Sequence, residues 1–275
     1  HDVNDKEGIR SNSIYSLLVD DRGAVWVGHF QAGLDYSLYQ NGLFRTYAYP
    51  PLFNSANLSI RSFENRGQEK VIGSRDGLFY INEATGVVKS FVKPVLTSDL
   101  ILTISFYQGE YYIGTYGGGM MVLNPGTLSL KYFAQGDTEL FQKGHIFCVK
   151  PDAKGNLWIG TSQGLFCYNG QTKQIKHFTS ANSQLPEGNV YEVSFDSTGK
   201  GWIATETGMC IYDPASQSLR SNVFPEGFVH RDKVRTIYED AGHNLYFIRE
   251  KGSLFTSTLT MDRFQNRSIF STLPD

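Results

Sequence analysis

The hydrophobic positions of this chain repeat at a nearly constant spacing. One column consists of three-residue motifs. A second, aliphatic column lies 13 or 14 residues before the last residue of each motif, and both columns recur in six copies. The last residues of successive motifs in the first column are 45, 41, 46, 44 and 44 residues apart. A repeat of this length takes precedence over any interpretation of single elements. The first column is Trp26-Val27-Gly28, Val71-Ile72-Gly73, Tyr112-Ile113-Gly114, Trp158-Ile159-Gly160, Trp202-Ile203-Ala204 and Tyr246-Phe247-Ile248; the second is Ile14, Ile60, Ile101, Ile146, Val190 and Val234.

Within each copy the pattern predicts four short strands. The first is a largely apolar run, such as 14–19 or 190–195, which is typical of a strand buried on both faces, and we expect it to be innermost. Asp20-x-x-Gly23, with the same spacing at 152 and 196, then fits a type I turn. The second strand carries the aromatic column, and a glycine closes it before the third strand. These glycines are Gly33, Gly77, Gly119, Gly164, Gly208 and Gly252.

The fourth strand is thinner and carries one basic residue per copy. A polyanion-binding surface is one interpretation of this column. Protection of an edge strand against sheet-to-sheet association is favoured, because six such residues would be spread around a rim. The column is Arg45, Lys89, Lys131, Lys176, Arg220 and Arg263.

Units of this length, each with four strands and an aromatic second strand, predict the blades of a β-propeller. Helical spacing is absent nearly everywhere. We therefore expect an all-β fold of four-stranded antiparallel blades, with residues 1–275 as a single domain. The six repeats span about 11–56, 57–97, 98–142, 143–186, 187–230 and 231–275.

Composition limits the function classes. The 275 residues are 40% hydrophobic and 14% aromatic, which supports a folded core, and a net charge of −2 gives no overall electrostatic reason to bind nucleic acid. The sequence contains no run of about 20 apolar residues, and we expect neither a membrane span nor a targeting leader among these residues. We expect the three cysteines, Cys148, Cys167 and Cys210, to be buried thiols, and they do not form a zinc or CxxC pattern.

The best-defined copies resemble the two-component regulator propeller repeat. The resemblance rests on Asn12-Ser13-Ile14-Tyr15-Ser16-Leu17 with Asp20-x-x-Gly23-x-Val25-Trp26-Val27-Gly28, and on Leu157-Trp158-Ile159-Gly160-Thr161-Ser162-Gln163-Gly164-Leu165. The copies that start near 57 and 231 are degenerate. The DxxGxxWxG half is shared in part with sialidase Asp boxes, whereas the GTxxGL half is not.

This resemblance implies the periplasmic sensor region of a hybrid two-component receptor from glycan-degrading gut bacteria. Such propellers usually have seven blades, so we expect a seventh blade outside this chain. The resemblance also implies a histidine kinase and a membrane helix elsewhere in the receptor. The implied partners are an oligosaccharide or neighbouring receptor domains, and a homodimer of the full receptor stays open.

Sequence signatures of catalysis are not found. Gly117-Gly118-Gly119 lacks the ending of a phosphate loop and is interpreted as a strand connection. No GxSxG, HExxH or paired CxxC occurs. We therefore expect no catalytic residue, no cofactor and no resident metal in this chain.

Loops from several blades are expected to meet on one face, where propellers bind their ligands. Polar planar groups beside an aromatic ring suit a sugar. A solvated loop surface is the alternative for any single residue. The candidate binding residues are His29, Gln31, Arg75, Asp76, Tyr116, His145, Gln163, Asn189, Glu206, His230, Arg231 and Arg249.

Three functions stay open at this point. The first is a non-catalytic sensor, and the second is a protein-interaction scaffold that uses the same face. The third is a metal-assisted lyase or hydrolase, because His29, His145 and His230 fall on that face and imidazoles serve as metal ligands and bases. Fold alone supports all three.

Overall fold

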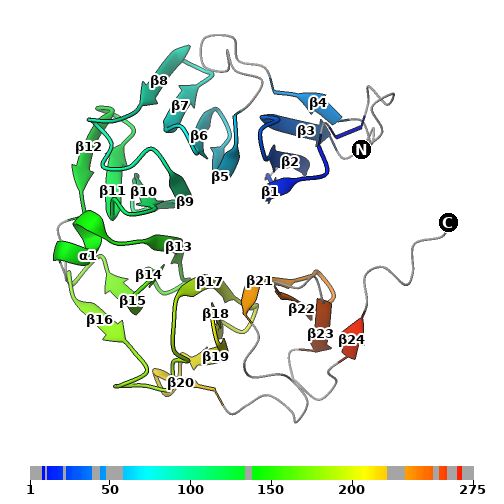
Figure 1. The fold of residues 1–275 in the computed structure, drawn as a ribbon, viewed down its shortest axis with the longest axis vertical. Helices are drawn as coiled ribbons and strands as arrows, with labels where there is room; N and C mark the ends of the chain where they lie inside the picture. Colours follow the sequence, from blue (N-terminus) through cyan, green and yellow to red (C-terminus); the bar gives the residue numbers. More distant parts are fainter. Residues whose placement is uncertain are drawn as a thin grey trace. The chain divides into compact units, whose positions relative to one another are not determined.

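The structure of the chain is a computed structural model (Figure 1). It describes residues 8–9, 11–20, 23–38, 44–47, 58–133, 138–221, 233–249, 254–258 and 265–267. The chain divides into two compact units, 1–146 and 147–275, which are treated separately below.

Unit 1 consists of short strands and one helical turn. Each strand has the length of a blade strand and ends where a turn glycine or a loop begins. Its elements are β1 (Ile14–Val19), β2 (Ala24–His29), β3 (Leu34–Leu38), β4 (Phe44–Thr46), β5 (Ile60–Arg66), β6 (Glu69–Ser74), β7 (Leu78–Asn82), β8 (Val87–Phe91), β9 (Ile101–Tyr107), β10 (Glu110–Thr115), β11 (Met120–Asn124), β12 (Ser129–Tyr132) and α1 (Thr138–Lys143).

Unit 2 repeats the same succession of strands. Its first strand, β13, starts at Ile146, the last residue of unit 1. The strands are β13 (Ile146–Pro151), β14 (Asn156–Thr161), β15 (Gly164–Asn169), β16 (Ile175–Phe178), β17 (Val190–Phe195), β18 (Gly201–Thr205), β19 (Gly208–Asp213), β20 (Ser218–Arg220), β21 (Val234–Glu239), β22 (Asn244–Arg249), β23 (Leu254–Thr258) and β24 (Gln265–Arg267).

Each repeat folds into one antiparallel sheet whose four strands follow one another in sequence order. In unit 1 the sheets are β1–β4, β5–β8 and β9–β12, and in unit 2 they are β13–β16, β17–β20 and β21–β24. Within unit 1 the first strand β5 contacts both β1 and β9, and within unit 2 β17 contacts β21. The predicted all-β propeller of four-stranded antiparallel blades is confirmed.

The aromatic column occupies equivalent positions in the second strands, as predicted. Trp202 pairs with Ser194 on the first strand and with Ile211 on the third, and Tyr246 pairs likewise with Tyr238 and Thr256. The column is buried at every copy except Tyr246, which is half-buried. The column therefore belongs largely to the buried core of the blades.

The Asp-x-x-Gly turns are confirmed and have a second role. The amide of Gly155 donates to the carbonyl oxygen of Asp152, which closes the turn. The Asp152 carboxylate then accepts the indole N–H of Trp158, at 2.9 Å between Oδ2 and Nε1. Asp20 with Trp26 and Asp196 with Trp202 make the same contact. The spacing of six residues thus joins the turn to the core ring.

The glycine column is small because the next blade packs against it. Gly73, Gly114 and Gly160 lie in extended strands, and none has a positive φ. A Cβ atom at Gly73 would come within 2.5 Å of Ile101, and one at Gly160 would come within 2.7 Å of the Val190 carbonyl oxygen. An aliphatic column residue of the next first strand therefore fills the glycine notch, as Ile101 does at Gly73 and Val190 at Gly160.

One helical turn was not predicted. α1 buries Leu140 and Phe141, and the amide of Gly119 donates to the carbonyl of Gly144 just after it. The turn therefore anchors the β10–β11 loop to the segment that leads to β13.

The fourth strands place their basic column on the outside, as predicted. Arg45, Lys89, Lys131, Lys176 and Arg220 are exposed, while Arg263 lies outside the described residues. Lys131 pairs with Glu110 at 2.8 Å. The cysteines are unpaired; Cys148 and Cys210 are buried and Cys167 is half-buried. Burial raises the pKa of all three thiols, to about 12 for Cys167.

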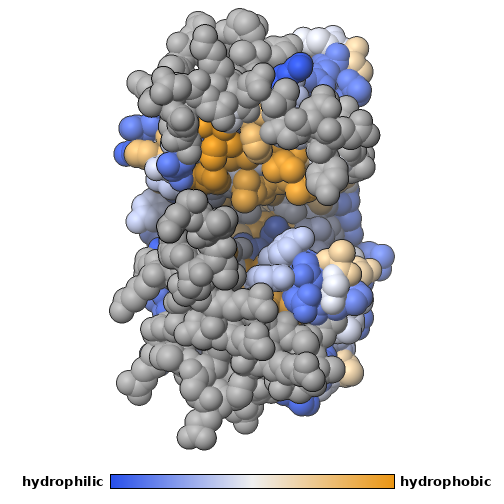
Figure 2. All heavy atoms as spheres, turned by 90° about the vertical axis from the view of Figure 1, so that its right-hand side faces the viewer, coloured by the Kyte–Doolittle hydropathy of each residue, from blue (hydrophilic) through white to orange (hydrophobic). Residues whose placement is uncertain are grey.

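The first strand of unit 1 differs from its counterparts in exposure. Ile14 and Leu17 are 41% and 66% exposed. The residues that pair in the same way in β5, Ile60 and Phe63, are buried. Figure 2, seen from the side on which Figure 1 draws β1–β4, shows hydrophobic residues at the surface. The apolar side chains on this face of β1 are therefore exposed, whereas their counterparts in β5 are buried.

Candidate functional site

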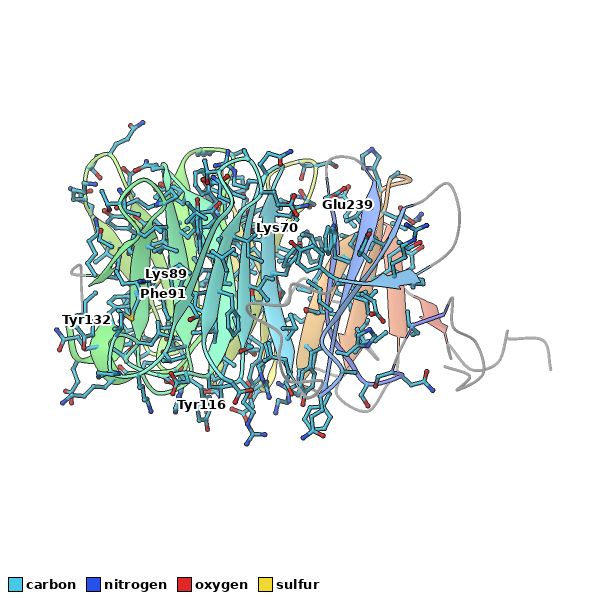
Figure 3. The ribbon with its side chains drawn as sticks, turned by 90° about the horizontal axis from the view of Figure 1, so that it is seen from above. Lys70, Lys89, Phe91, Tyr116, Tyr132 and Glu239 are labelled. Atoms are coloured by element: carbon cyan, nitrogen blue, oxygen red, sulfur yellow. The ribbon has the colours of Figure 1, made fainter. Side chains whose placement is uncertain are left out.

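The β10–β11 connection presents an exposed tyrosine. Tyr116 is 51% exposed and follows the last residue of β10. Its amide donates to the carbonyl of Leu100, and its carbonyl accepts the hydroxyl of Ser98 at 2.9 Å. Figure 3 shows Tyr116 at one end of the unit 1 strands, while Lys70 lies toward the other end. The loop backbone is thus held from the preceding segment while the ring stays accessible.

Tyr116 stacks on His145, which is another predicted site residue. The ring centroids are 4.0 Å apart and the planes differ by 24°. His145 is half-buried. The structure therefore brings these two candidates together into a flat aromatic surface, which suits the C–H face of a sugar ring.

The glycines of this loop are required by close approach. Gly117 and Gly119 have φ of 78° and 71°. A Cβ atom at Gly118 would lie 2.6 Å from Thr97 Oγ1, and one at Gly119 would overlap the carbonyl of Phe141. The glycine run is therefore a strand connection, as predicted, and it fixes Tyr116 beside His145.

Three further candidates in unit 1 lie in exposed loops. Gln31, Arg75 and Asp76 are exposed at the ends of β2 and β6. The amide of Gln31 donates to the hydroxyl of Ser59, and the amide of Arg75 donates to the backbone carbonyl of Ser59. Ser59 therefore holds the two loop backbones at one point of the face.

His29 lies inside the sheet and away from the loop surface. Its side chain is 0% exposed, and Nε2 is 3.0 Å from the carboxylate of Asp35, which is also buried. The equivalent strand-end positions in the next four copies are Ser74, Thr115, Thr161 and Thr205, whose hydroxyls donate to the closing glycine carbonyl. The first copy thus replaces a local hydroxyl contact with a buried His–Asp pair.

In unit 2 the candidates Asn189 and Glu206 meet. The amide of Glu206 donates to the carbonyl of Asn189 at 2.9 Å, and the Glu206 carboxylate accepts the Asn189 amide at 3.4 Å. Gln163 is exposed, and its carbonyl is 2.8 Å from Nε2 of His177. Arg249 ends β22. His230 and Arg231 lie outside the described residues.

The sequence interpretation missed one group of side chains on the first strands. Five of these strands, β1, β5, β9, β17 and β21, have a β-bulge directly after the aliphatic column residue, as the register skips from Ile14 to Ser16 and from Val190 to Glu192. A bulge re-aims the extra side chain and is frequent near binding sites. We call these side chains the bulge row: Tyr15, Arg61 and Leu102 in unit 1, Tyr191 and Arg235 in unit 2.

Neighbouring members of the bulge row contact each other. In unit 1 the guanidinium carbon of Arg61 lies 4.6 Å from the ring centre of Tyr15. In unit 2 that of Arg235 lies 4.6 Å from Tyr191, whose hydroxyl accepts from Asn189. The sequence signal was the large residue that follows each aliphatic column position, and Asn189 connects the row to the predicted loop site.

A Ser–His–Glu group in unit 2 does not have the geometry of a catalytic triad. The Ser197 hydroxyl and the Glu239 carboxylate both lie at the same imidazole nitrogen, Nδ1 of His243, at 3.1 and 2.6 Å. A triad needs the two partners on opposite ring nitrogens. Ser197 also donates directly to Glu239. The group links the turns of adjacent blades.

Among the residues that the structure describes, no set of three or more His, Cys, Asp or Glu side chains is placed to hold a metal ion. Within the same ranges no helix has the length and apolar character that crossing a membrane requires.

Comparison with known proteins agrees with the repeat pattern. The sequence profile described as two component regulator propeller matches residues 8–31 and 141–163. The resemblance to this repeat, first seen in the sequence, is thereby confirmed. No curated protein matches the chain.

Solved structures share the fold. The extracellular domain assigned to the hybrid two component system BT3049 of B. thetaiotaomicron has a TM-score of 0.75 at 24% identity; the match covers 91% of this chain and 34% of that domain. The corresponding domain assigned to BT4673, from the same organism, has 0.62 at 16% identity, with 90% and 38% covered. The chain thus spans about a third of these domains. YCF48 bound to D1 peptide has 0.70 at 12% identity, with 95% and 83% covered.

Proposed function

We propose that this chain, which carries two component regulator propeller repeats, is the ligand-sensing or interaction module of a hybrid two-component sensor. The observation that carries the proposal is the agreement between the matched repeats and the fold of two extracellular domains assigned to such systems. In this role the propeller is periplasmic and non-catalytic, and the kinase belongs to another part of the receptor.

An oligosaccharide fragment is the ligand that the site chemistry supports best. The stacked rings of Tyr116 and His145 offer a flat surface in unit 1. Asn189 and Tyr191 supply amide and hydroxyl groups in unit 2. Aromatic rings and planar polar groups are both features of sugar-binding surfaces, and each unit is proposed as a surface of its own. Neighbouring receptor domains are the second class of partner that we propose for these surfaces.

The exposed face of β1 supports an additional blade, as in a seven-bladed propeller. In consecutive blades a glycine notch receives an aliphatic residue of the next first strand, as Gly73 receives Ile101. Ile14 is the corresponding aliphatic residue on the exposed face of β1. The sheet that fits this face therefore carries a small residue at the notch position.

A protein-interaction scaffold is the second candidate function. It is favoured by the peptide-bound structure of YCF48, because the same fold accommodates a peptide there at a TM-score of 0.70. In this case the face would bind protein and no sugar.

Calorimetric titration of the full chain with defined oligosaccharides tests the sensor proposal. We expect saturable binding of at least one oligosaccharide, weakened by about 1 to 3 kcal/mol in Tyr116→Ala, because an aromatic contact at a binding surface has that typical value. Tyr132→Ala is the matched control, since Tyr132 is 47% exposed but lies on β12. The two variants should melt at nearly the same temperature as the wild type.

Three results would contradict the proposal. One is the absence of binding to every oligosaccharide by a folded chain. The second is an equal weakening of oligosaccharide binding in Tyr116→Ala and Tyr132→Ala, which would show that the binding surface does not include the β10–β11 loop. The third is turnover of an oligosaccharide that stops when a chelator is added, which would favour the metal-assisted enzyme.

A further inference from the structure

Basic side chains surround one ring of the bulge row in unit 2. The Arg235 guanidinium carbon and the Lys233 ammonium nitrogen lie 4.6 and 4.9 Å from the centre of the Tyr191 ring. Phe147 contacts the same ring edge-on, at 5.1 Å between centroids. The Tyr191 hydroxyl accepts Nδ2 of Asn189 at 3.0 Å. Tyr191 is therefore fixed by its neighbours and in turn holds two cations by cation–π contact.

The same pair of residue types recurs in unit 1. Tyr15 belongs to one blade and Arg61 to the next, as Tyr191 and Arg235 do in unit 2. The distance from guanidinium carbon to ring centre is 4.6 Å in both units. Nε of Arg61 is buried and has no hydrogen-bond partner among the described residues. A tyrosine bulge followed by an arginine bulge is thus a repeated local arrangement.

This arrangement prepares a guanidinium for an anion. Contact with a ring limits the rotamers of the arginine, so less conformational entropy is lost when a ligand binds. A guanidinium donates two parallel N–H groups to a carboxylate or sulfate. These charge-assisted hydrogen bonds are stronger than the hydrogen bonds that a guanidinium makes to a neutral hydroxyl. Arg235 is exposed and Lys233 half-buried, so the cations can be reached from solvent. Two positive charges beside one ring also raise the local positive potential.

A carboxylate from the adjacent connection contacts the same segment. Glu206 accepts the backbone amide of Asn189, two residues before Tyr191, at 3.4 Å. The arginine approaches the ring itself. The acidic and basic groups therefore contact different parts of the Asn189–Tyr191 segment, and a ligand oriented by both would place its anionic group toward Arg235.

We propose that the Tyr191–Arg235 pair, and its counterpart Tyr15–Arg61, bind a sugar that carries a carboxylate or sulfate group. The proposal deepens the sensor function and rests on it, because it gives the chemical class of the oligosaccharide. Carboxylated and sulfated sugars share the chemistry that a guanidinium recognises, and the experiment below separates them.

Calorimetry on the full chain with three probes tests the charge requirement. The probes are trigalacturonic acid, its fully methyl-esterified form and a sulfated galactose oligosaccharide that carries no carboxylate. We expect one of the two anionic probes to bind at least about tenfold more tightly than the methyl ester, because one charge-assisted contact is lost. Binding should weaken as NaCl is raised from about 50 to about 300 mM. The better anionic probe identifies the group.

Variants then locate the anionic group. Arg235→Gln should weaken binding of the better anionic probe by about tenfold or more, and Arg61→Gln should weaken it if the ligand occupies the unit 1 pair. Arg235→Lys should recover part of the loss, since it restores the charge but not the planar donor pair. Arg220→Gln, which removes an exposed charge on β20, should leave the affinity unchanged.

Several outcomes would overturn the inference. Equal affinity for trigalacturonic acid and its methyl ester would do so, as would unchanged affinity for the anionic probe in both Arg235→Gln and Arg61→Gln. If the chain binds a neutral oligosaccharide but neither anionic probe, the charge inference fails and the sensor proposal stands. If it binds neither neutral nor anionic oligosaccharides while folded, both proposals fail.

Discussion

The carboxylate of Asp152 accepts the indole N–H of Trp158 at 2.9 Å, across the hairpin that joins β13 and β14. The same carboxylate accepts the backbone amide of Asn156 at 2.8 Å. One side chain therefore serves both the turn and a buried ring. An acidic residue is needed here because all the groups that approach it are donors.

Asp152→Asn should lower the free energy of unfolding by about 1 to 3 kcal/mol, because one carboxylate oxygen becomes an amide that faces N–H donors. Chemical denaturation measures this change. Asp213→Asn is the control, since Asp213 accepts a turn amide but no indole. A double-mutant cycle with Trp158→Phe should show coupling between the two positions. Additive losses would show that the indole contact contributes nothing beyond the turn.

Gly160→Ala should destabilise the fold by about 1 to 3 kcal/mol, since the added methyl group has no space and must displace its neighbours. The new Cβ atom would lie 2.5 Å from Sγ of Cys148 and 2.7 Å from the Val190 carbonyl oxygen. Thermal and chemical unfolding check the prediction. Gly126→Ala, where the nearest atom is 3.4 Å away, should change little. A stable Gly160→Ala protein would show that the blades can separate slightly at the notch.

Leu17→Ala should leave the stability of this chain within about 0.5 kcal/mol of wild type, because the side chain is already exposed. Val193, which pairs in the same way with its second strand, is buried, and Val193→Ala should cost about 1.5 to 3 kcal/mol. In a longer chain with an additional blade, the cost of Leu17→Ala should rise to about 2 to 5 kcal/mol. A large loss in this chain would mean that β1 is already covered.

Glu239 should make stability fall in acid. Partial burial raises the pKa of its carboxyl, but hydrogen bonds from His243 and Ser197 lower it more, so the pKa lies below the ordinary value of 4.5. A lowered folded-state pKa contributes stability above the unfolded-state pKa, and this contribution is lost as the pH falls through the folded-state value. Denaturation between about pH 6 and pH 3 should therefore show a steeper loss for the wild type than for Glu239→Gln. Parallel curves would contradict this assignment.

The repeat pattern predicted the blades because packing between neighbouring blades requires residues of a particular size at fixed positions. A glycine in an extended strand, 13 or 14 residues after an aliphatic residue, has few explanations besides a close neighbour. For the aspartate six residues before each tryptophan, the sequence predicts only a place in a turn. Its bond to the indole depends on how the hairpin folds back, which spacing alone does not specify.

The candidate site was predicted less completely. Tyr116 and His145 were both chosen from their loops, but their stacking depends on the backbone contacts of α1 and Ser98. The bulge row was missed because a bulge is a property of strand register, which one strand's sequence does not reveal. His29 was expected at the surface, and its burial depends on Asp35, which faces it only across the β2–β3 pair.

The contact between Gly73 and Ile101 gives the blades that it joins a direction, with a notch on one strand and a projection on another. A duplicated repeat brings one of each, so the array can lengthen by whole units and leave no interface unmatched. Gene duplication therefore has a ready-made unit of growth in this fold. The same polarity means that a blade inserted in reverse order, or one without its notch, would interrupt the array at two interfaces.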